Sequence, residues 1–140
     1  MKKLMKNYQQ NETHICKVVL LGESSVGKTS ILSRFINDRF NKNEIATTGA
    51  AYATKSIIFK DYNNQIIKFE IWDTAGQEKY RSLSKIFYKD ASIAILVYDI
   101  TKEKTFEEIK NYWYPQIKEN SVEDISIKYL IFIFLFYLDK

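Results

Sequence analysis

The sequence has few of the residues on which disulfides, chain breaks and membrane spans depend. It contains one cysteine and one proline among 140 residues, and the lone cysteine, Cys16, excludes an internal disulfide. Cys16 falls in an apolar run, which fits a buried thiol in a reducing compartment such as the cytoplasm. The longest wholly apolar run, residues 129–138, falls well short of the roughly 20 residues that a membrane-spanning helix needs. We therefore expect a cytoplasmic protein without a transmembrane span.

Signals for secretion, lipidation and nucleic-acid binding are also missing. Residues 1–13 are polar and basic without the apolar core of a secretory signal, and Lys2 excludes N-myristoylation. We predict that residues 1–13 form a disordered lead-in to a single domain. The net charge of +4 is small, and the basic residues are mixed with acidic ones instead of forming a stripe. Nucleic acid is therefore not an expected partner.

Short β-branched apolar runs alternate with helical patterns along the chain. Residues 15–21 form an apolar run that ends at a glycine, which is typical of a strand buried on both faces of a parallel sheet. From Lys28, apolar residues recur at helical spacing as far as Asn37. Three more strand-like runs follow, at residues 50–59, 66–72 and 91–98. An Asn-rich turn separates the first two, which predicts an antiparallel hairpin.

The last helical pattern carries two local signals. Thr105 and Glu108 have the spacing of a capping box, which predicts a helix that begins at Thr105. Pro115 is expected to kink this helix one turn before its end, and a fifth strand beginning at Ile125 is compatible with the sequence. The alternation of helices and strands predicts an α/β open sheet that is mostly parallel, with one antiparallel hairpin strand and helices on both faces.

The stretch GESSVGKTS, residues 22–30, carries the most specific chemical signal. It has the pattern Gly22-x-x-x-x-Gly27-Lys28-Thr29 between a predicted strand and a predicted helix, which is the context of a phosphate-binding P-loop. In such a loop successive backbone N–H groups surround the phosphates, and the helix that follows points its positive end at them. The alternative is a glycine turn with a chance lysine. It needs four fixed identities that coincide in well under about 1% of sequences.

The residues of this loop have distinct predicted roles. Lys28 supplies a mobile positive charge to the β- and γ-phosphates, and the Thr29 hydroxyl is a hard oxygen ligand suited to Mg²⁺. The predicted nucleotide-binding residues of the loop are Gly22, Glu23, Ser24, Ser25, Val26, Gly27, Lys28, Thr29 and Ser30.

A second polar group follows the predicted strand at residues 66–72. Asp73 stands at the carboxyl end of that strand, where open α/β sheets bind ligands, and is predicted to help hold Mg²⁺. A helix N-cap is the alternative role for Asp73, but the P-loop favours the metal. Gly76 can offer its N–H group to a γ-phosphate, and Gln77 can orient the attacking water.

Together these motifs resemble the Rab branch of the Ras-like small GTPases. The matching stretches are GESSVGKTS, TTGAAY at residues 47–52, WDTAGQEKYRSL at residues 72–83 and VYDIT at residues 97–101, in the family's order and spacing. The Glu23-Ser24-Ser25 loop and Gly49-Ala-Ala look most like the early-endosomal Rab subgroup. The resemblance covers residues 14–127 and implies a Ras-like small GTPase domain with the P-loop fold.

The resemblance also implies roles for residues outside the P-loop. Thr47 is the switch threonine, which binds Mg²⁺ and senses the γ-phosphate, and Phe40 begins the switch loop beside the nucleotide. Asn43 and Thr48 depart from the aromatic and apolar residues usual there, so we expect the loop to close less firmly. The implied catalytic residues are Gln77, Lys28 and Thr47, and the implied metal ligands are Thr29, Thr47 and Asp73.

Tyr52, Trp72 and Phe87 take the places of the family's aromatic triad, the surface by which effectors recognise the GTP-bound state. Ordinary core packing is the alternative for all three, and for Trp72 the two roles have equal weight. The resemblance further implies GTP and GDP as ligands, Mg²⁺ as cofactor and slow GTP hydrolysis. The implied partners are exchange factors, GTPase-activating proteins and effectors, and the implied location is at endosomal or vesicle membranes.

Residues 128–140 depart from the family pattern. The guanine-reading Asn-Lys-x-Asp would fall at residues 132–135, which are apolar, and no C-terminal cysteine is available for prenylation. We therefore expect an atypical hydrophobic tail and a sheet that is incomplete at the C-terminus. We also expect weak binding of GTP and ATP within about tenfold of each other. A hydrophobic anchor or partner-binding segment is the functional alternative for the tail.

These features favour a Rab-like GTPase switch in vesicle trafficking. The competing hypothesis is a truncated, non-enzymatic decoy that keeps the effector-like surface but holds no nucleotide stably. A P-loop kinase is a third and weaker hypothesis, because the sequence shows no arginine-rich lid.

Overall fold

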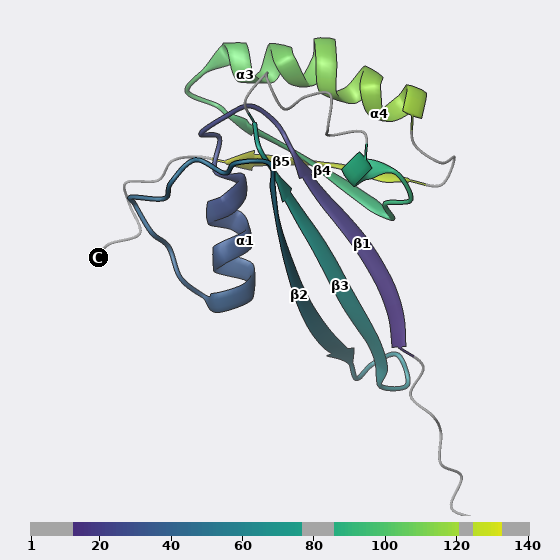
Figure 1. Ribbon diagram of the computed structural model, residues 1–140. Coiled ribbons are helices and arrows are strands. Elements are labelled where there is room, and N and C mark those ends of the chain that lie inside the picture. Colours follow the sequence, from purple (N-terminus) through teal and green to yellow (C-terminus); the bar gives the residue numbers. More distant parts are fainter. Residues whose placement is uncertain (1–12, 77–85, 121–124, 133–140) are drawn as a thin grey trace, which may run out of the picture.

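The computed structural model describes residues 13–76, 86–120 and 125–132, in which a twisted sheet separates two layers of helix (Figure 1). The strand order is β2-β3-β1-β4-β5. The strands are β1 (Thr13–Leu21), β2 (Ala50–Phe59), β3 (Gln65–Thr74), β4 (Ile93–Asp99) and β5 (Ser126–Phe132). All neighbouring pairs are parallel except β2 and β3, which form an antiparallel hairpin. This topology confirms the predicted fold class and the predicted hairpin.

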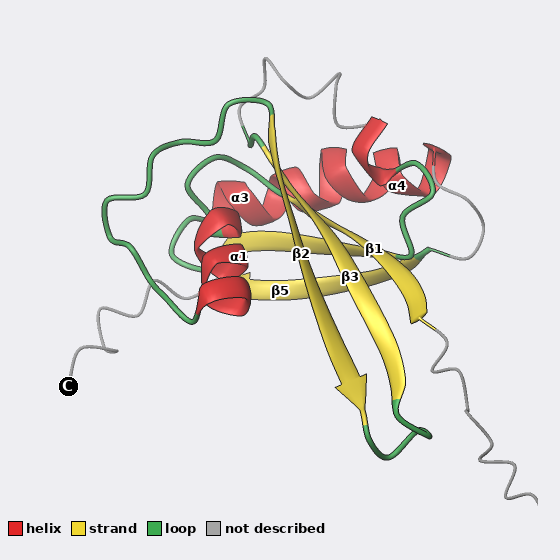
Figure 2. Ribbon diagram, turned by 60° about the horizontal axis from the view of Figure 1, so that its bottom comes forward, coloured by secondary structure: helices red, strands yellow, loops and turns green. Residues whose placement is uncertain are grey.

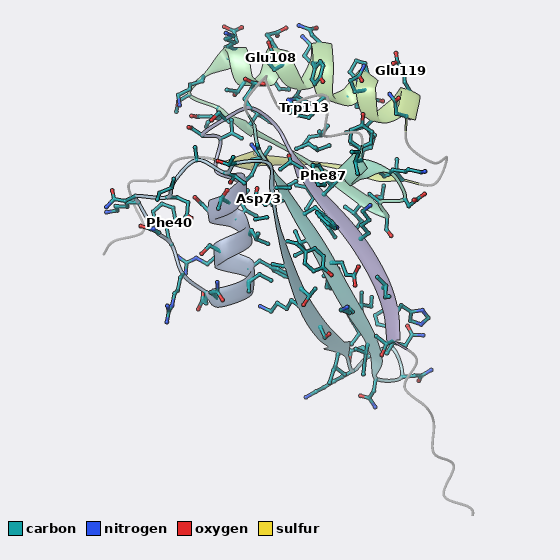
Figure 3. All side chains as sticks on the ribbon, in the orientation of Figure 1. Phe40, Asp73, Phe87, Glu108, Trp113 and Glu119 are labelled. Carbon is teal, nitrogen blue, oxygen red and sulfur yellow. The ribbon has the colours of Figure 1, made fainter. Side chains whose placement is uncertain are left out.

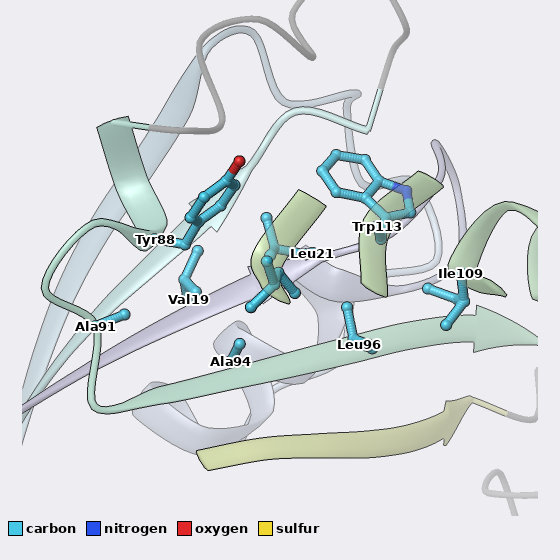
Figure 4. Close-up of a cluster of buried hydrophobic side chains, with 9 residues drawn as sticks. Val19, Leu21, Tyr88, Ala91, Ala94, Leu96, Ile109 and Trp113 are labelled. Atoms are coloured by element: carbon cyan, nitrogen blue, oxygen red, sulfur yellow. The ribbon is translucent and has the colours of Figure 1, made fainter. Parts of the chain in front are cut away.

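Alternate residues of β1 enter two separate apolar clusters, because successive side chains of a strand point to opposite faces. Val18 and Leu20 pack with Leu32 of α1 (Lys28–Asn37) and with Ile71 of β3. Val19 and Leu21 belong to the second cluster on the other face, drawn in Figure 4. The remaining buried members of that cluster are Tyr88, Ala91, Ala94, Leu96, Ile109, Trp113 and Ile117. The second half of β1, from Val18 to Leu21, is thus buried on both faces as its apolar run predicted, whereas Ile15 at the start of that run is 63% exposed.

The helical layer over the second cluster has three consecutive parts, α3 (Glu103–Glu108), the π-helical segment η2 (Ile109–Trp113) and α4 (Tyr114–Asn120). Its inward-facing residues Ile109, Trp113 and Ile117 are all fully or almost fully buried. Pro115 follows η2 closely, and the structure accommodates the proline with this π-helical segment, in which the regular bonding pattern changes.

The predicted capping box is wrong, because the helix begins at Glu103 and not after Thr105. The Thr105 hydroxyl accepts a hydrogen bond from the backbone N–H of Asp99 at 3.0 Å and donates to the carbonyl of Lys102 at 2.8 Å. This hydroxyl therefore joins the turn before the helix to the end of β4, and does not cap the helix N-terminus.

The carboxyl ends of the parallel strands meet at one edge of the sheet. In the register Leu20 lies beside Asp73 and Leu21 lies beside Leu96, so the segments after β1, β3 and β4 start close together. Figure 2 shows the β2–β3 hairpin extending away from the helices at the opposite end. Strand β5 crosses the boundary between residues 127 and 128 at which we predicted a change to an atypical tail. Residues 133–140 of that tail lie outside the described residues.

Candidate nucleotide site

The loop between β1 and α1 has the backbone conformations that a phosphate-binding loop needs. Gly22 has φ 144°, and a Cβ atom there would lie 2.1 Å from the carbonyl oxygen of Val97. Gly27, with φ 97°, directly precedes the first residue of α1, and Ser25 has φ 60°. The positive φ at Gly27 favours glycine, and the close approach of β4 at Gly22 excludes any side chain. The two glycines of the motif are therefore required by the fold itself.

Lys28 is drawn into this loop. Its side chain is only 5% exposed, and its Nζ atom donates to the carbonyl oxygens of Gly22 at 2.9 Å and Glu23 at 2.7 Å. Burial lowers the pKa of Lys28 to about 8, although the charges of Asp73 and Glu23 oppose this shift. Among the described residues, carbonyl oxygens and no carboxylate lie at hydrogen-bond distance from the Lys28 ammonium, and a phosphate group would supply a full negative charge there.

Three oxygen-bearing side chains from separate elements meet beside Lys28. The Thr29 hydroxyl of α1 donates to Oδ2 of Asp73 in β3 at 2.6 Å. The Thr47 hydroxyl, from the loop after α1, lies 2.8 Å from the Thr29 hydroxyl and donates to the same Asp73 oxygen at 3.3 Å. The structure thus brings together the three residues that were predicted as metal ligands.

The Asp73 carboxylate is completely buried and only partly satisfied. Its second oxygen, Oδ1, has no hydrogen-bond partner among the described residues. Burial raises the pKa of Asp73, while the hydrogen bond from Thr29 and the charge of Lys28 act in the opposite direction. A buried carboxylate oxygen without a donor is costly and suits a bound cation.

Lys28, Thr29 and Thr47 line a cavity of about 380 Å³ at the sheet edge, whereas the buried Asp73 is not among the lining residues. Its walls come from the P-loop and the start of α1, the loop over residues 41–47, the end of β3 and the turn before α3. The lining residues are Ser24, Ser25, Gly27, Lys28, Thr29, Ser30, Asn41, Lys42, Glu44, Ile45, Ala46, Thr47, Thr74, Gly76 and Lys102.

Phe40 is a predicted nucleotide-binding residue that the structure does not bring to this cavity. Its side chain is 41% exposed and is not among the lining residues. Figure 3 places Phe40 on the loop beyond α1, well away from Asp73. The predicted site residues Gly22, Glu23, Val26 and Asp73 are also not among the lining residues.

Gly76 lies directly against the P-loop. A Cβ atom at Gly76 would come within 2.3 Å of the carbonyl carbon of Glu23 and 2.4 Å of the backbone nitrogen of Ser24. Only glycine fits this contact, since backbone atoms cannot withdraw as a flexible side chain can. Gln77, the predicted water-orienting residue, lies outside the described residues.

The three aromatic residues predicted as an effector surface form a continuous row. The ring centroids of Tyr52 and Trp72 are 4.9 Å apart, and those of Trp72 and Phe87 are 5.4 Å apart. Tyr52 is 49% exposed, whereas Trp72 and Phe87 pack partly against the cluster of Figure 4. The row therefore combines core packing at one end with an accessible ring at the other.

Sequence reasoning missed several residues of the cavity wall, above all Lys102. The motif VYDIT was noted only as part of the family resemblance, yet its strand ends at Asp99 beside the P-loop strand. The available signal was the parallel arrangement, because side chains that follow neighbouring parallel strands share one edge of the sheet. A lysine three residues after Asp99 was thus a candidate for the same site.

Comparison with known proteins agrees with this geometry. The Ras family matches residues 17–131. The chain is similar to the Ras-related protein Rab-22A of Homo sapiens, with 45% identity over 111 residues that cover 79% of this chain and 55% of the human protein. It is also similar to the GTP-binding protein YPT52 of Saccharomyces cerevisiae, with 43% identity over 120 residues, 82% of this chain and 51% of the yeast protein.

The chain spans about half the length of the curated relatives it matches. Within residues 13–76, 86–120 and 125–132, no helix combines the length and the apolar character of a membrane span. The match to the Ras family covers most of the chain, and both relatives confirm the resemblance to Rab proteins seen in the motifs. The chain therefore belongs to the Ras family and is, within it, a Rab-like protein.

Proposed function

We propose that this chain binds GTP and GDP together with Mg²⁺ and hydrolyses GTP slowly, as a Rab-like switch in endosomal membrane trafficking. The observation that carries the proposal is the meeting of Thr29, Thr47 and Asp73 beside the buried Lys28. These side chains come from α1, the following loop and β3, so three separate segments place oxygen groups beside one buried ammonium group. We propose residues 14–127 as the extent of the GTPase domain.

The donor set fits Mg²⁺. The ion prefers hard oxygen ligands and binds proteins through few carboxylates, with phosphate and water completing its shell. Within the described residues no cluster of three histidine, cysteine or acidic side chains offers a different metal site. Thr29, Thr47 and Asp73 would hold the ion, and Asp73 Oδ1 offers an oxygen that no described donor occupies. When bound, Mg²⁺ supplies positive charge against the phosphate oxygens.

The chain's own groups then divide the remaining work. Lys28 is buried within the P-loop and supplies its ammonium charge to the terminal phosphates. When a nucleotide binds, phosphate oxygens replace the carbonyls of Gly22 and Glu23 as the hydrogen-bond partners of this ammonium group. Gly76, which contacts the P-loop backbone and lines the cavity, is proposed from the family resemblance to offer its N–H group to the terminal phosphate. Gln77 is proposed from the family resemblance to orient the water that attacks the terminal phosphate.

The aromatic row Tyr52, Trp72 and Phe87 is proposed as the effector surface. In support, Trp72 lies in the same strand as Asp73, so a change at the metal ligand has a direct backbone route to the row. Exchange factors, GTPase-activating proteins and effectors, as well as the endosomal location, are proposed by similarity to Rab-22A.

Extraction of bound nucleotide from the purified chain tests the proposal. A switch that holds its nucleotide should release about one GDP per chain on denaturation followed by ion-exchange chromatography. Lys28→Ala should release little or none, and Lys104→Ala, which removes an exposed lysine from α3, should match the unaltered chain. An empty, folded chain that still binds Rab effectors would instead support the decoy hypothesis.

A further inference from the structure

The turn between β4 and α3 places a second lysine in the wall of the nucleotide cavity. Lys102 lines this cavity together with Ser24, Ser25 and Gly76, and its side chain is 60% exposed. Its Nζ atom lies 3.2 Å from Oδ2 of Asp99, whose side chain is only 3% exposed. The ammonium group is therefore tethered to a buried carboxylate at the edge where the P-loop begins.

Hydrogen bonds on both sides make this turn rigid. The backbone N–H of Lys102 donates to the carbonyl of Asp99 at 2.9 Å, and that of Thr105 donates to the carbonyl of Lys102 at 2.9 Å. Oδ1 of Asp99 accepts from the N–H of Thr101 at 2.9 Å and from its hydroxyl at 2.6 Å. When the lysine leaves Oδ2, Oδ1 keeps both donors from Thr101, and the cost of exposing Oδ2 without its partner must be offset by the new contact of the lysine.

The charges around the cavity suit a polyphosphate. Three lysines, Lys28, Lys42 and Lys102, line it against a single acidic residue, Glu44. Lys28 is buried within the P-loop, and Lys42 belongs to an exposed loop. Lys102 differs from both, because a hydrogen-bonded turn fixes its backbone while a flexible four-carbon stem leaves its ammonium free to move.

We propose that Lys102 binds the terminal phosphate of the nucleotide and so favours the triphosphate over the diphosphate. This inference rests on the proposed function, since it assigns a further residue to the same site. Asp99 is the alternative partner of the Lys102 ammonium group. The lysine pairs with Oδ2 of Asp99 when the terminal phosphate is absent and turns toward that phosphate when it is present. Thr101 and Thr105 position the turn and do not touch the nucleotide.

The affinities of GDP and a non-hydrolysable GTP analogue, measured by competition against a fluorescent GDP, test this role. Lys102→Ala should weaken binding of the analogue about fivefold more than binding of GDP, the size expected of a charge pair that is partly exposed. Lys102→Arg keeps the charge and should stay within about twofold of the unaltered chain. Lys104→Ala removes an equal charge two residues away, outside the cavity, and should leave the ratio unchanged.

The outcomes separate this inference from the proposed function. A chain that binds neither nucleotide overturns both. A chain that binds both, with the same ratio in Lys102→Ala as in Lys104→Ala, overturns only the role of Lys102. Equal losses for GDP and the analogue in Lys102→Ala also overturn it, because the lysine would then act on the inner phosphates. The melting temperature of each variant confirms that the exposed side chain has been changed without unfolding.

Discussion

Raising the pH from 7 to 9 should weaken phosphate binding through one residue, Lys28. Burial lowers the pKa of this lysine to about 8 in the nucleotide-free chain. At pH 7 roughly nine in ten of the lysines carry a charge, and at pH 9 roughly one in ten does. Because a bound phosphate interacts with the charged form, the affinity for GDP should fall about tenfold over this range, or by about 1.4 kcal/mol.

The sign of the effect follows from linkage. A phosphate beside Lys28 stabilises the ammonium and raises its pKa, so the complex binds more protons than the free chain above pH 8. Calorimetry in two buffers of different ionisation enthalpy should therefore detect proton uptake on GDP binding at pH 8.5. The free energy of unfolding of the nucleotide-free chain changes in the opposite sense. It rises as the pH increases from about 8 toward the pKa of an unperturbed lysine, because Lys28 loses its buried charge in the folded chain and keeps its charge in the unfolded chain.

Lys28→Arg is the matched control for the pH experiment. The guanidinium stays charged at every pH in the range, so its GDP affinity should stay level between pH 7 and 9 even if its absolute value is lower. Fluorescent GDP titrations at fixed salt and Mg²⁺ measure both chains. A level profile in the unaltered chain, or the same decline in Lys28→Arg, would refute the assignment of the affinity change to this lysine.

Three other experiments probe different parts of the molecule. Gly76→Ala should reduce nucleotide affinity at least about tenfold, because the added Cβ meets the backbone of Glu23 and Ser24 within 2.4 Å. Titration with fluorescent GDP measures this affinity, and an unchanged value would contradict the contact. Trp113→Ala should lower the free energy of unfolding, measured by urea denaturation, by about 3–5 kcal/mol, because Trp113 is fully buried. Phe106→Ala should lower it by under about 1 kcal/mol, because the Phe106 side chain is 39% exposed. Similar losses in both variants would speak against the packing of the cluster. Gln77→Leu should keep GDP affinity and slow single-turnover GTP hydrolysis, while Lys28→Ala should lose the affinity itself; equal loss of binding in both would show that the two roles are misassigned.

Much of the fold was predictable because its signals are local. The apolar run before Gly22, the helical spacing after Lys28 and the Asn-rich turn between the hairpin strands each determine their own element. The prediction that Thr105 caps a helix was wrong, because the spacing of a capping box does not show that the Thr105 hydroxyl bonds to the end of β4. That contact depends on how a turn folds back on a strand, which no local pattern encodes.

The candidate site divides in the same way. The P-loop residues were predictable from their spacing, and Asp73 from its place at a strand end. The meeting of Thr47 with Thr29 and Asp73 was implied only by resemblance, since a long polar loop separates Thr47 from both. Lys102 was missed because its presence in the cavity depends on the β1–β4 register and on the turn after Asp99.

The Mg²⁺ dependence of GDP release tests the central claim most directly. If Thr29, Thr47 and Asp73 hold the ion beside the phosphates, chelating Mg²⁺ should speed the release of fluorescent GDP at least about tenfold in the unaltered chain. Asp73→Asn should release it quickly with or without Mg²⁺, because the only carboxylate of the group is lost. Release from the unaltered chain at the same rate with Mg²⁺ and with chelator would contradict the account.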